Sequence, residues 1–205
     1  MEEHFMKKKI LYTILALALI LLAGCKRKDI KLNTKDAEVN TVVIKRDGTV
    51  QAATVEEFSK EYYSLDALNN FITKEINKFN KSLGSETAIT IDSLEMNGET
   101  AVLILTYQNL DTYGAFNKVE AVTMGLDALS GSNLELPDVF VKEDNGSYVK
   151  KEEALKNEKY KVVMINDSVD LMVEGTIKYY ANCILVNSRT IQTAPEGASV
   201  IVYKP

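Results

Sequence analysis

Apolar residues recur every three or four positions between residues 58 and 83, which is the spacing of one face of an α-helix. The members of this series are Phe58, Tyr62, Leu65, Leu68, Ile72, Ile76, Phe79 and Leu83. Ser64 is suited to cap the first turn, Asp66 to lie near its free amides, and Gly84 to end the helix. The pattern therefore predicts one long helix near residues 65–83.

Shorter apolar stretches on either side of this helix are separated by turn residues, as in β-hairpins. Asp47-Gly48 and Asn97-Gly98 each divide such a region in two, and both dipeptides accept the positive φ of a tight hairpin turn. The strands predicted around these turns are residues 41–45 and 49–53, then residues 88–95 and 100–108. Residues 102–105 are apolar at every position, which predicts a central strand that is covered on both faces.

The second half of the chain continues in short strands. The pattern predicts strands at residues 139–141, 161–165, 169–173, 176–186 and 199–203, with a short helix at 150–156. Residues 109–136 carry only brief turn signals and receive no assignment. Because strands precede and follow the helix and hairpins outnumber crossovers, we expect an α+β fold in which a mostly antiparallel sheet packs on one principal helix.

The N-terminus has a different pattern. Three lysines, Lys7 to Lys9, precede an apolar run of fourteen residues from Ile10 to Ala23. A helix that spans a bilayer needs about 20 apolar residues, so the shorter run fits the hydrophobic region of a signal peptide. The run ends in Leu22-Ala23-Gly24-Cys25, which is not an ordinary A-x-A cleavage site.

This ending resembles the lipobox of bacterial lipoproteins, in which a Leu and two small residues precede a Cys. The resemblance implies that Leu22, Ala23 and Gly24 are recognised by the signal peptidase and that Cys25 becomes the first residue, its thiol bearing diacylglycerol with acyl chains such as palmitate. Two acyl chains, at about 0.8 kcal/mol per buried CH₂, hold a protein stably on a membrane. The resemblance therefore implies a lipid-anchored protein on the extracytoplasmic face of the cell membrane. An uncleaved membrane helix is the alternative, which the short run disfavours.

Charge divides the rest of the chain into two parts. Lys26–Lys35 contains five basic residues and one acidic residue, whereas the chain from Ala37 onward has sixteen basic and twenty-five acidic residues. We therefore predict a signal peptide over residues 1–24, the lipidated Cys25 with a flexible tether over 25–38, and one domain over 39–205. The basic tether favours an anionic membrane surface or is simply solvated. The acidic domain argues against nucleic acid as a partner.

Several kinds of catalysis are excluded by composition. The one histidine, His4, lies in the predicted signal peptide, so the mature chain has no histidine for a catalytic triad or a zinc site. With Cys25 carrying lipid, Cys183 is the one cysteine left, and a disulfide within the chain is not expected. A lone cysteine in an apolar strand usually acts as a small hydrophobic residue, because a nucleophile needs a base to lower its pKa.

Acidic side chains form two groups in the sequence. The first group is Glu143, Asp144, Glu152 and Glu153, and the second is Asp167, Asp170 and Glu174. Paired carboxylates bind Ca²⁺ or act as the acid and base of a glycosidase. The chain has no EF-hand loop, and solvated turns on an acidic surface are the simpler interpretation of both groups.

Tyrosines and one serine complete the candidates. The tyrosines are Tyr62-Tyr63, Tyr107, Tyr113 and Tyr179-Tyr180, and such side chains line sugar or peptide sites as well as cores. In an adjacent pair on a strand, one ring faces inward and the other outward. Ser147 and Lys150 match the S-x-x-K pattern of penicillin-binding enzymes, but the S-D-N and K-T-G motifs are missing, so a turn before a short helix is favoured.

The body also has a looser resemblance, carried by a hairpin followed by Tyr62-Tyr63, by a helix ending in residues 76–80 (INKFN), and by residues 111–117 (DTYGAFN) after a strand. This order resembles uncharacterised small lipoproteins of Gram-positive anaerobes. The resemblance implies the class of protein and supplies no site.

These observations predict a membrane-anchored lipoprotein whose extracytoplasmic domain binds a protein or glycan of the cell envelope without catalysis, cofactor or metal. The alternative is a small envelope enzyme that uses carboxylates, of the glycan hydrolase type. A transporter's binding component is disfavoured, because such proteins have two lobes and the 167 residues from Val39 to Pro205 make one domain.

Overall fold

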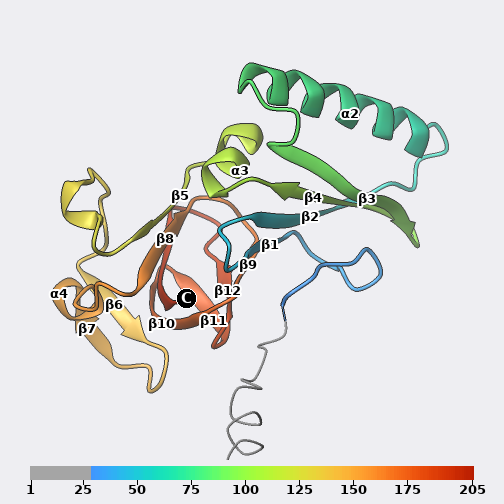
Figure 1. Ribbon diagram of the computed structural model, residues 1–205. Helices are drawn as coiled ribbons and strands as arrows, with labels where there is room; N and C mark the ends of the chain where they lie inside the picture. Colours follow the sequence, from blue (N-terminus) through green and yellow to red (C-terminus); the bar gives the residue numbers. More distant parts are fainter. Residues whose placement is uncertain (1–28) are drawn as a thin grey trace, which may run out of the picture.

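The computed structural model describes residues 29–205, so the predicted signal peptide and Cys25 lie outside the described residues. Within this range the chain forms thirteen strands in two sheets, three α-helices and one short 3₁₀-helix (Figure 1). The mixed α and β content is confirmed. The proportions differ from the expectation, because the strands form most of the body and the helices are minor. No helix of the described range is long and apolar enough to cross a bilayer.

The first sheet has seven strands in the order β11-β12-β9-β1-β2-β4-β3. Their bounds are β1 Thr41–Ile44, β2 Val50–Glu57, β3 Ile89–Asn97, β4 Thr100–Tyr107, β9 Asp170–Val173, β11 Cys183–Asn187 and β12 Thr190–Thr193. All neighbours are antiparallel except β1 and β9. The two predicted hairpins are present, with Gly48 and Gly98 at positive φ in their turns. The apolar strand β4 lies between β2 and β3, as expected.

The second sheet has six antiparallel strands in the order β5-β8-β13-β10-β6-β7. Their bounds are β5 Ala121–Gly125, β6 Val139–Lys142, β7 Tyr148–Lys150, β8 Lys161–Ile165, β10 Thr176–Ala181 and β13 Ser199–Lys204. Strand β13 alternates between two cores: Ile201 and Tyr203 pack in the main cluster with Leu171 of the first sheet, while Val200 and Val202 pack in a second cluster. The second sheet is therefore apolar on both faces.

The predicted long helix is present as α2, Leu65–Ser82, and the Ser64 side chain accepts a hydrogen bond from the Ala67 amide. It lies at one end of the molecule over β3 (Figure 1), and Ile76 and Asn80 are its only fully buried residues. The Asn80 side chain accepts from the Ile89 amide and donates to the Ile89 carbonyl, which ties the helix to the start of β3. Helix α2 therefore covers one edge of the first sheet and contributes Ile76 to the main core, whose other members come largely from the strands of both sheets.

The region without a sequence assignment, residues 109–136, contains α3 (Leu110–Asn117), β5 and the 3₁₀-helix η1 (Leu129–Gly131). Asn109 caps α3 by accepting from the Thr112 amide, and Lys118 ends it in the left-handed conformation. The predicted helix at 150–156 is shorter in the structure, α4 at Lys151–Ala154.

The predicted strand 176–186 is wrong, because two strands occupy this region and belong to different sheets. The chain turns at Asn182, whose φ of 51° is left-handed, so β10 ends at Ala181 in the second sheet and β11 begins at Cys183 in the first. The Asn182 side-chain Nδ2 donates to the Ala198 carbonyl, and the Ser199 hydroxyl donates to the Asn182 backbone carbonyl. Strands β7 and β12 were not predicted.

Part of the predicted tether is packed against the body. The Leu32 amide donates to the Gln51 side chain on β2, and Leu32 and Ala37 pack with Val102 and Ile104 of β4. These apolar residues lie in a polar stretch whose composition predicted flexibility. Residues 30–37 thus lie on the outer face of the first sheet, the face opposite the main core, and the folded body begins before residue 39.

Candidate binding cleft

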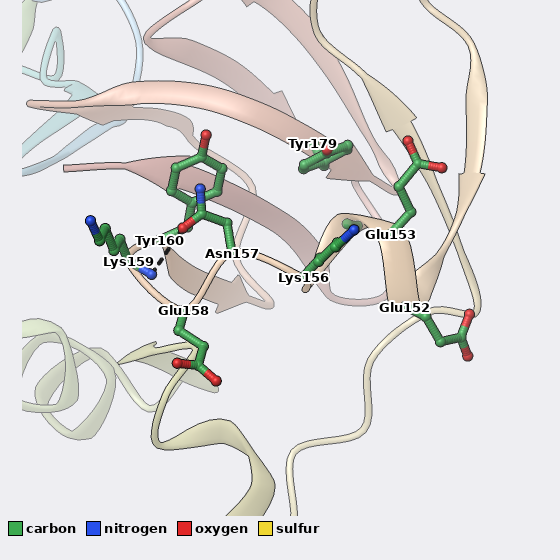
Figure 2. Close-up of a pocket in the computed structure, with 9 residues that line it drawn as sticks. Glu152, Glu153, Lys156, Asn157, Glu158, Lys159, Tyr160 and Tyr179 are labelled. Carbon is green, nitrogen blue, oxygen red and sulfur yellow. Dashed lines mark hydrogen bonds between the residues drawn. The ribbon is translucent and has the colours of Figure 1, made fainter.

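A solvent-open cleft of about 960 Å³ lies beside the second sheet, between α4, the turn that follows it and β10 (Figure 2). Its lining combines carboxylates, lysines, one amide and two tyrosines. The lining residues are Glu152, Glu153, Ala154, Lys156, Asn157, Glu158, Lys159, Tyr160 and Tyr179. Most of them belong to the short segment that connects β7 with β8, so local turn geometry largely determines the shape of the cleft.

The turn at residues 157–160 is held by Asn157. Its side-chain oxygen accepts from the Lys159 amide at 3.1 Å, and its carbonyl accepts from the Tyr160 amide at 2.9 Å. These bonds hold the Tyr160 backbone where β8 begins. Figure 2 shows the side chains of Glu152 and Glu158 pointing away from the two tyrosine rings.

Tyr179 comes from the middle of β10, and its ring and that of Tyr180 lie on opposite faces as predicted, but neither ring points outward into solvent, because both faces of this sheet are packed. The Tyr179 ring packs on the cluster that includes Phe140, while Tyr180 packs against the main core on the other face. Tyr160 packs on the same cluster as Tyr179. Both rings are half-buried, so each has an apolar support beneath it and an accessible part toward the cleft.

Lysine–carboxylate pairs surround the rings. Lys142 Nζ lies 2.7 Å from Glu153 Oε1, and Lys178 Nζ lies 3.9 Å from Glu143 Oε2. The hydrogen bond from Lys142 to Glu153 raises the pKa of the lysine, and the nearby charge of Glu153 adds to this effect. A smaller hollow of about 120 Å³, lined by Lys142, Glu143, Asp144 and Lys178, adjoins the cleft and shares Tyr160 and Tyr179 with it.

The first acidic group is therefore brought together around two tyrosines. Glu152 and Glu153 line the cleft, and Glu143 and Asp144 line the adjoining hollow. Within residues 29–205, no group of three or more Cys, His, Asp or Glu side chains is arranged to hold a metal ion. Since Glu143 and Glu153 each face a lysine, the arrangement offers paired charges and aromatic surface, which suit recognition of a polar ligand.

The second acidic group separates into individual roles. Glu174 is buried, and its carboxylate accepts from the Ile30 amide at 2.7 Å and the Arg46 amide at 3.1 Å. Asp167 accepts from the Tyr113 hydroxyl at 2.5 Å. Asp170 is half-buried on β9, and desolvation raises its pKa. Glu174 and Asp167 thus have structural partners, and the group does not form one site.

Most of the other candidate residues are packed in the core or form local hydrogen bonds, which indicates structural roles. Tyr107 and Tyr113 are buried with ring centroids 5.2 Å apart, and burial raises the pKa of Tyr107 to about 12. Cys183 packs on the main core, and burial raises its pKa to about 12, which opposes thiolate formation. Ser147 lies in the exposed turn between β6 and β7, where its amide donates to the Asn145 side chain.

Tyr62 and Tyr63 precede α2 rather than lying within it, because Ser64 caps the helix. Tyr62 is exposed and meets Tyr63 edge to face at 4.9 Å, while Tyr63 stacks on Phe58 at 4.7 Å. This aromatic group is far from the cleft in sequence and lies on the side of the first sheet, whereas the cleft belongs to the second.

Comparison with known protein families, curated proteins and solved structures finds no match to this chain. The cleft and the adjoining hollow contain residues that the sequence did not single out, chiefly Tyr160, which lines both, and Lys142 and Lys178, which line the hollow. Tyr160 follows a polar turn, and the two lysines alternate with apolar residues on strands, so each has an ordinary local pattern. The pairing of β6 with β10 aligns Lys142 with Tyr179, and the turn after α4 brings Tyr160 beside them.

Proposed function

We propose that this chain is a bacterial lipoprotein anchored to the extracytoplasmic face of the cell membrane by diacylglycerol on Cys25. The observation that carries the proposal is Leu22-Ala23-Gly24-Cys25 at the end of a fourteen-residue apolar run that follows Lys7–Lys9. Two acyl chains give a stable anchor, whereas a single chain gives a reversible one. The folded body is then held beside the membrane, outside the cytoplasm.

We further propose that the body binds a glycan or peptide of the cell envelope without catalysing a reaction, and that the cleft is its binding site. Tyr160 and Tyr179 supply flat, partly apolar surface beside hydrogen-bonding groups, as sugar and peptide sites require. The Lys142–Glu153 pair is accessible, so both of its charges can exchange partners with a ligand. No cofactor or metal enters this proposal.

The anchor is tested by the mass of the N-terminal peptide of the chain purified from a bacterial membrane. The expected peptide begins at Cys25 and carries the mass of a diacylglyceryl group. A peptide that begins upstream, or an unmodified Cys25, would contradict the proposal.

The binding site is tested by titrating the purified lipoprotein with soluble peptidoglycan fragments, which contain both sugar and peptide. We expect Tyr179→Ala to weaken binding at least tenfold, since stacking surface in the cleft is lost. Tyr148→Ala is the matched control, because Tyr148 is an exposed tyrosine of the neighbouring strand β7 that does not line the cleft. Equal affinities of the two variants would rule out this cleft.

A small glycan hydrolase is the second candidate, favoured by Glu152 and Glu153 at the cleft. Such an enzyme needs one carboxylic acid and one carboxylate at the scissile bond. Glu153 pairs with Lys142, and Glu152 points away from the two tyrosine rings (Figure 2), so the two carboxylates do not converge on one position in the cleft. Release of reducing sugar ends from peptidoglycan by the wild-type chain, abolished by Glu153→Gln, would replace the binding proposal with this one.

A further inference from the structure

The place where the chain enters the folded body is defined by Glu174. This carboxylate at the end of β9 accepts the Ile30 amide, and Cys25 is only five residues earlier in the sequence. Five residues reach at most about 18 Å when fully extended. A lipid on Cys25 therefore keeps the Glu174 end of the first sheet within about this distance of the bilayer surface.

Strand alternation places Glu174 on the outer face of the first sheet. Leu171 and Val173 point into the main core, so Asp170, Met172 and Glu174 point outward. Residues 30–37 cover the outer face of β2 and β4, through Leu32 and Ala37. The outer face over β9, β12 and β11 continues from this covered part toward the edge of the sheet (Figure 1).

This second part of the outer face exposes apolar side chains. Ile184 pairs with Gln192, which pairs with Asp170, so all three lie in one outward row. Ile184 is 65% exposed and Val186 is 57% exposed. Ile184 lies in the row of Asp170, which is two strands across the sheet (roughly 10 Å) and four residues along β9 (roughly 13 Å) from Glu174. Val186 lies nearer to the Glu174 end, because Asn187 aligns through Thr190 with Met172. Both exposed residues thus lie within the reach of the chain that leads to Cys25.

Basic residues occur at the end of this face and in the sequence before it. Arg46 follows β1 at the Glu174 end, where Lys45 pairs with Glu174 at 3.9 Å, and Lys26, Arg27 and Lys28 precede Ile30 in the sequence. The carboxylate of Glu174 is occupied by its own partners, which leaves Asp170 as the acidic side chain of the outward row. Apolar side chains bordered by basic ones match the interfacial region of an anionic bilayer.

We infer that the outer face of β9, β12 and β11 rests on the anionic bilayer surface, with Ile184 and Val186 in the interfacial layer. This inference rests on the proposed anchoring through Cys25. The membrane holds the body in one orientation, and helix α2, which carries the exposed residue Phe71, lies at the end of the molecule away from β9, β12 and β11 (Figure 1).

The test uses the full chain, purified as the lipoprotein and reconstituted in vesicles of equal parts phosphatidylcholine and phosphatidylglycerol. A fluorophore is attached to Ile184→Cys, or to Phe71→Cys as the matched control, in a chain that also carries Cys183→Ala. Phe71 is 62% exposed, nearly the same as Ile184, so the two sites differ mainly in position. Val186→Cys provides a second site if Ile184→Cys does not fold.

Nitroxide-labelled lipid should quench the fluorophore at residue 184 or 186 and leave the fluorophore at residue 71 unquenched. Equal quenching at both positions, or none at either, would overturn the orientation while the anchor stands. If the fluorophore at residue 184 is already shielded from water in detergent without lipid, a second copy of the chain covers this face, and the inference is overturned. If the peptide mass shows no lipid on Cys25, the proposed function fails, and the inference fails with it.

Discussion

The two acidic groups of this protein both consist of aspartate and glutamate, but their surroundings differ. Glu153 of the first group is half exposed and pairs with the flexible side chain of Lys142 beside the cleft. Glu174 of the second group is 4% exposed and accepts hydrogen bonds from two backbone amides. The partner of a carboxylate, rather than the number of acidic neighbours, separates the structural role of Glu174 from the binding role that we propose for the first group.

The difference follows from how easily each carboxylate can leave its hydrogen-bonding partner. A backbone amide cannot leave its place without unfolding part of the chain, so Glu174 keeps the entering segment attached to β9. A lysine at an open cleft can rotate toward water or a ligand at small cost. We therefore expect substitutions in the second group to change stability and substitutions in the first to change binding.

Removal of the Glu174 carboxylate should have the largest effect on stability. Glu174→Ala leaves the Ile30 and Arg46 amides without their acceptor, and we expect the free energy of unfolding to fall by about 3 kcal/mol. Urea denaturation of residues 29–205 measures this loss, and Glu153→Ala is the matched control from the first group. Equal losses in both variants would remove the distinction between the two groups.

Alkaline pH should lower the free energy of unfolding, because buried groups in the core near the second acidic group then lose their protons. Burial raises the pKa of Tyr107 from its ordinary 10.0 to about 12 and that of Cys183 from 9.0 to about 12, and it also raises that of Tyr113. Each group binds its proton more tightly in the folded state, so its contribution is complete below pH 9 and is lost as the pH rises toward 12. Unfolding midpoints measured across this range should fall steadily, and a constant midpoint would contradict the burial of these groups.

Loss of the Tyr113 hydroxyl should have a moderate effect on stability. Tyr113→Phe removes its hydrogen bond to Asp167, and we expect a loss of about 1 kcal/mol at neutral pH. The same variant should have a flatter alkaline transition, because one buried phenol no longer titrates. Tyr148→Phe, at an exposed position, is expected to change neither property.

Loss of the Lys142–Glu153 ion pair should have the smallest effect on stability. Lys142→Met removes an accessible ion pair, and such pairs contribute little to folding. We expect the urea midpoint of this variant to equal that of the wild type, while its affinity for peptidoglycan fragments falls. A large stability loss would show that the pair is structural and belongs with Glu174.

Local signals in the sequence predicted the elements that are defined locally. The spacing of apolar residues, with Ser64 before them and Gly84 after them, was sufficient for α2, and Asp47-Gly48 and Asn97-Gly98 were sufficient for the first two hairpins. The position of α2 at the edge of the molecule was not predictable in this way. An amphipathic pattern indicates which face is buried, but the area that it covers depends on the strands beneath it.

The missed features depend on contacts between distant segments. Asn182 lies inside an apolar run, and its left-handed turn is stabilised by carbonyl groups of residues 196 and 198, which the local pattern does not reveal. The segment at 30–37 is polar in composition, yet Leu32 and Ala37 pack on β4, and the side chains of Glu174 and Gln51 accept from the Ile30 and Leu32 amides. The carboxylates of the cleft were among the candidates, but their pairing with Lys142 and Lys178 required the alignment of β6 with β10.

Anchoring through Cys25 is tested most directly by incorporation of radiolabelled palmitate in a bacterial host. The chain has two cysteines, so Cys25→Ala and Cys183→Ala form a matched pair. We predict that Cys183→Ala is labelled like the wild type, and that Cys25→Ala is unlabelled and remains unprocessed. Equal labelling of the wild type and Cys25→Ala would contradict the assignment.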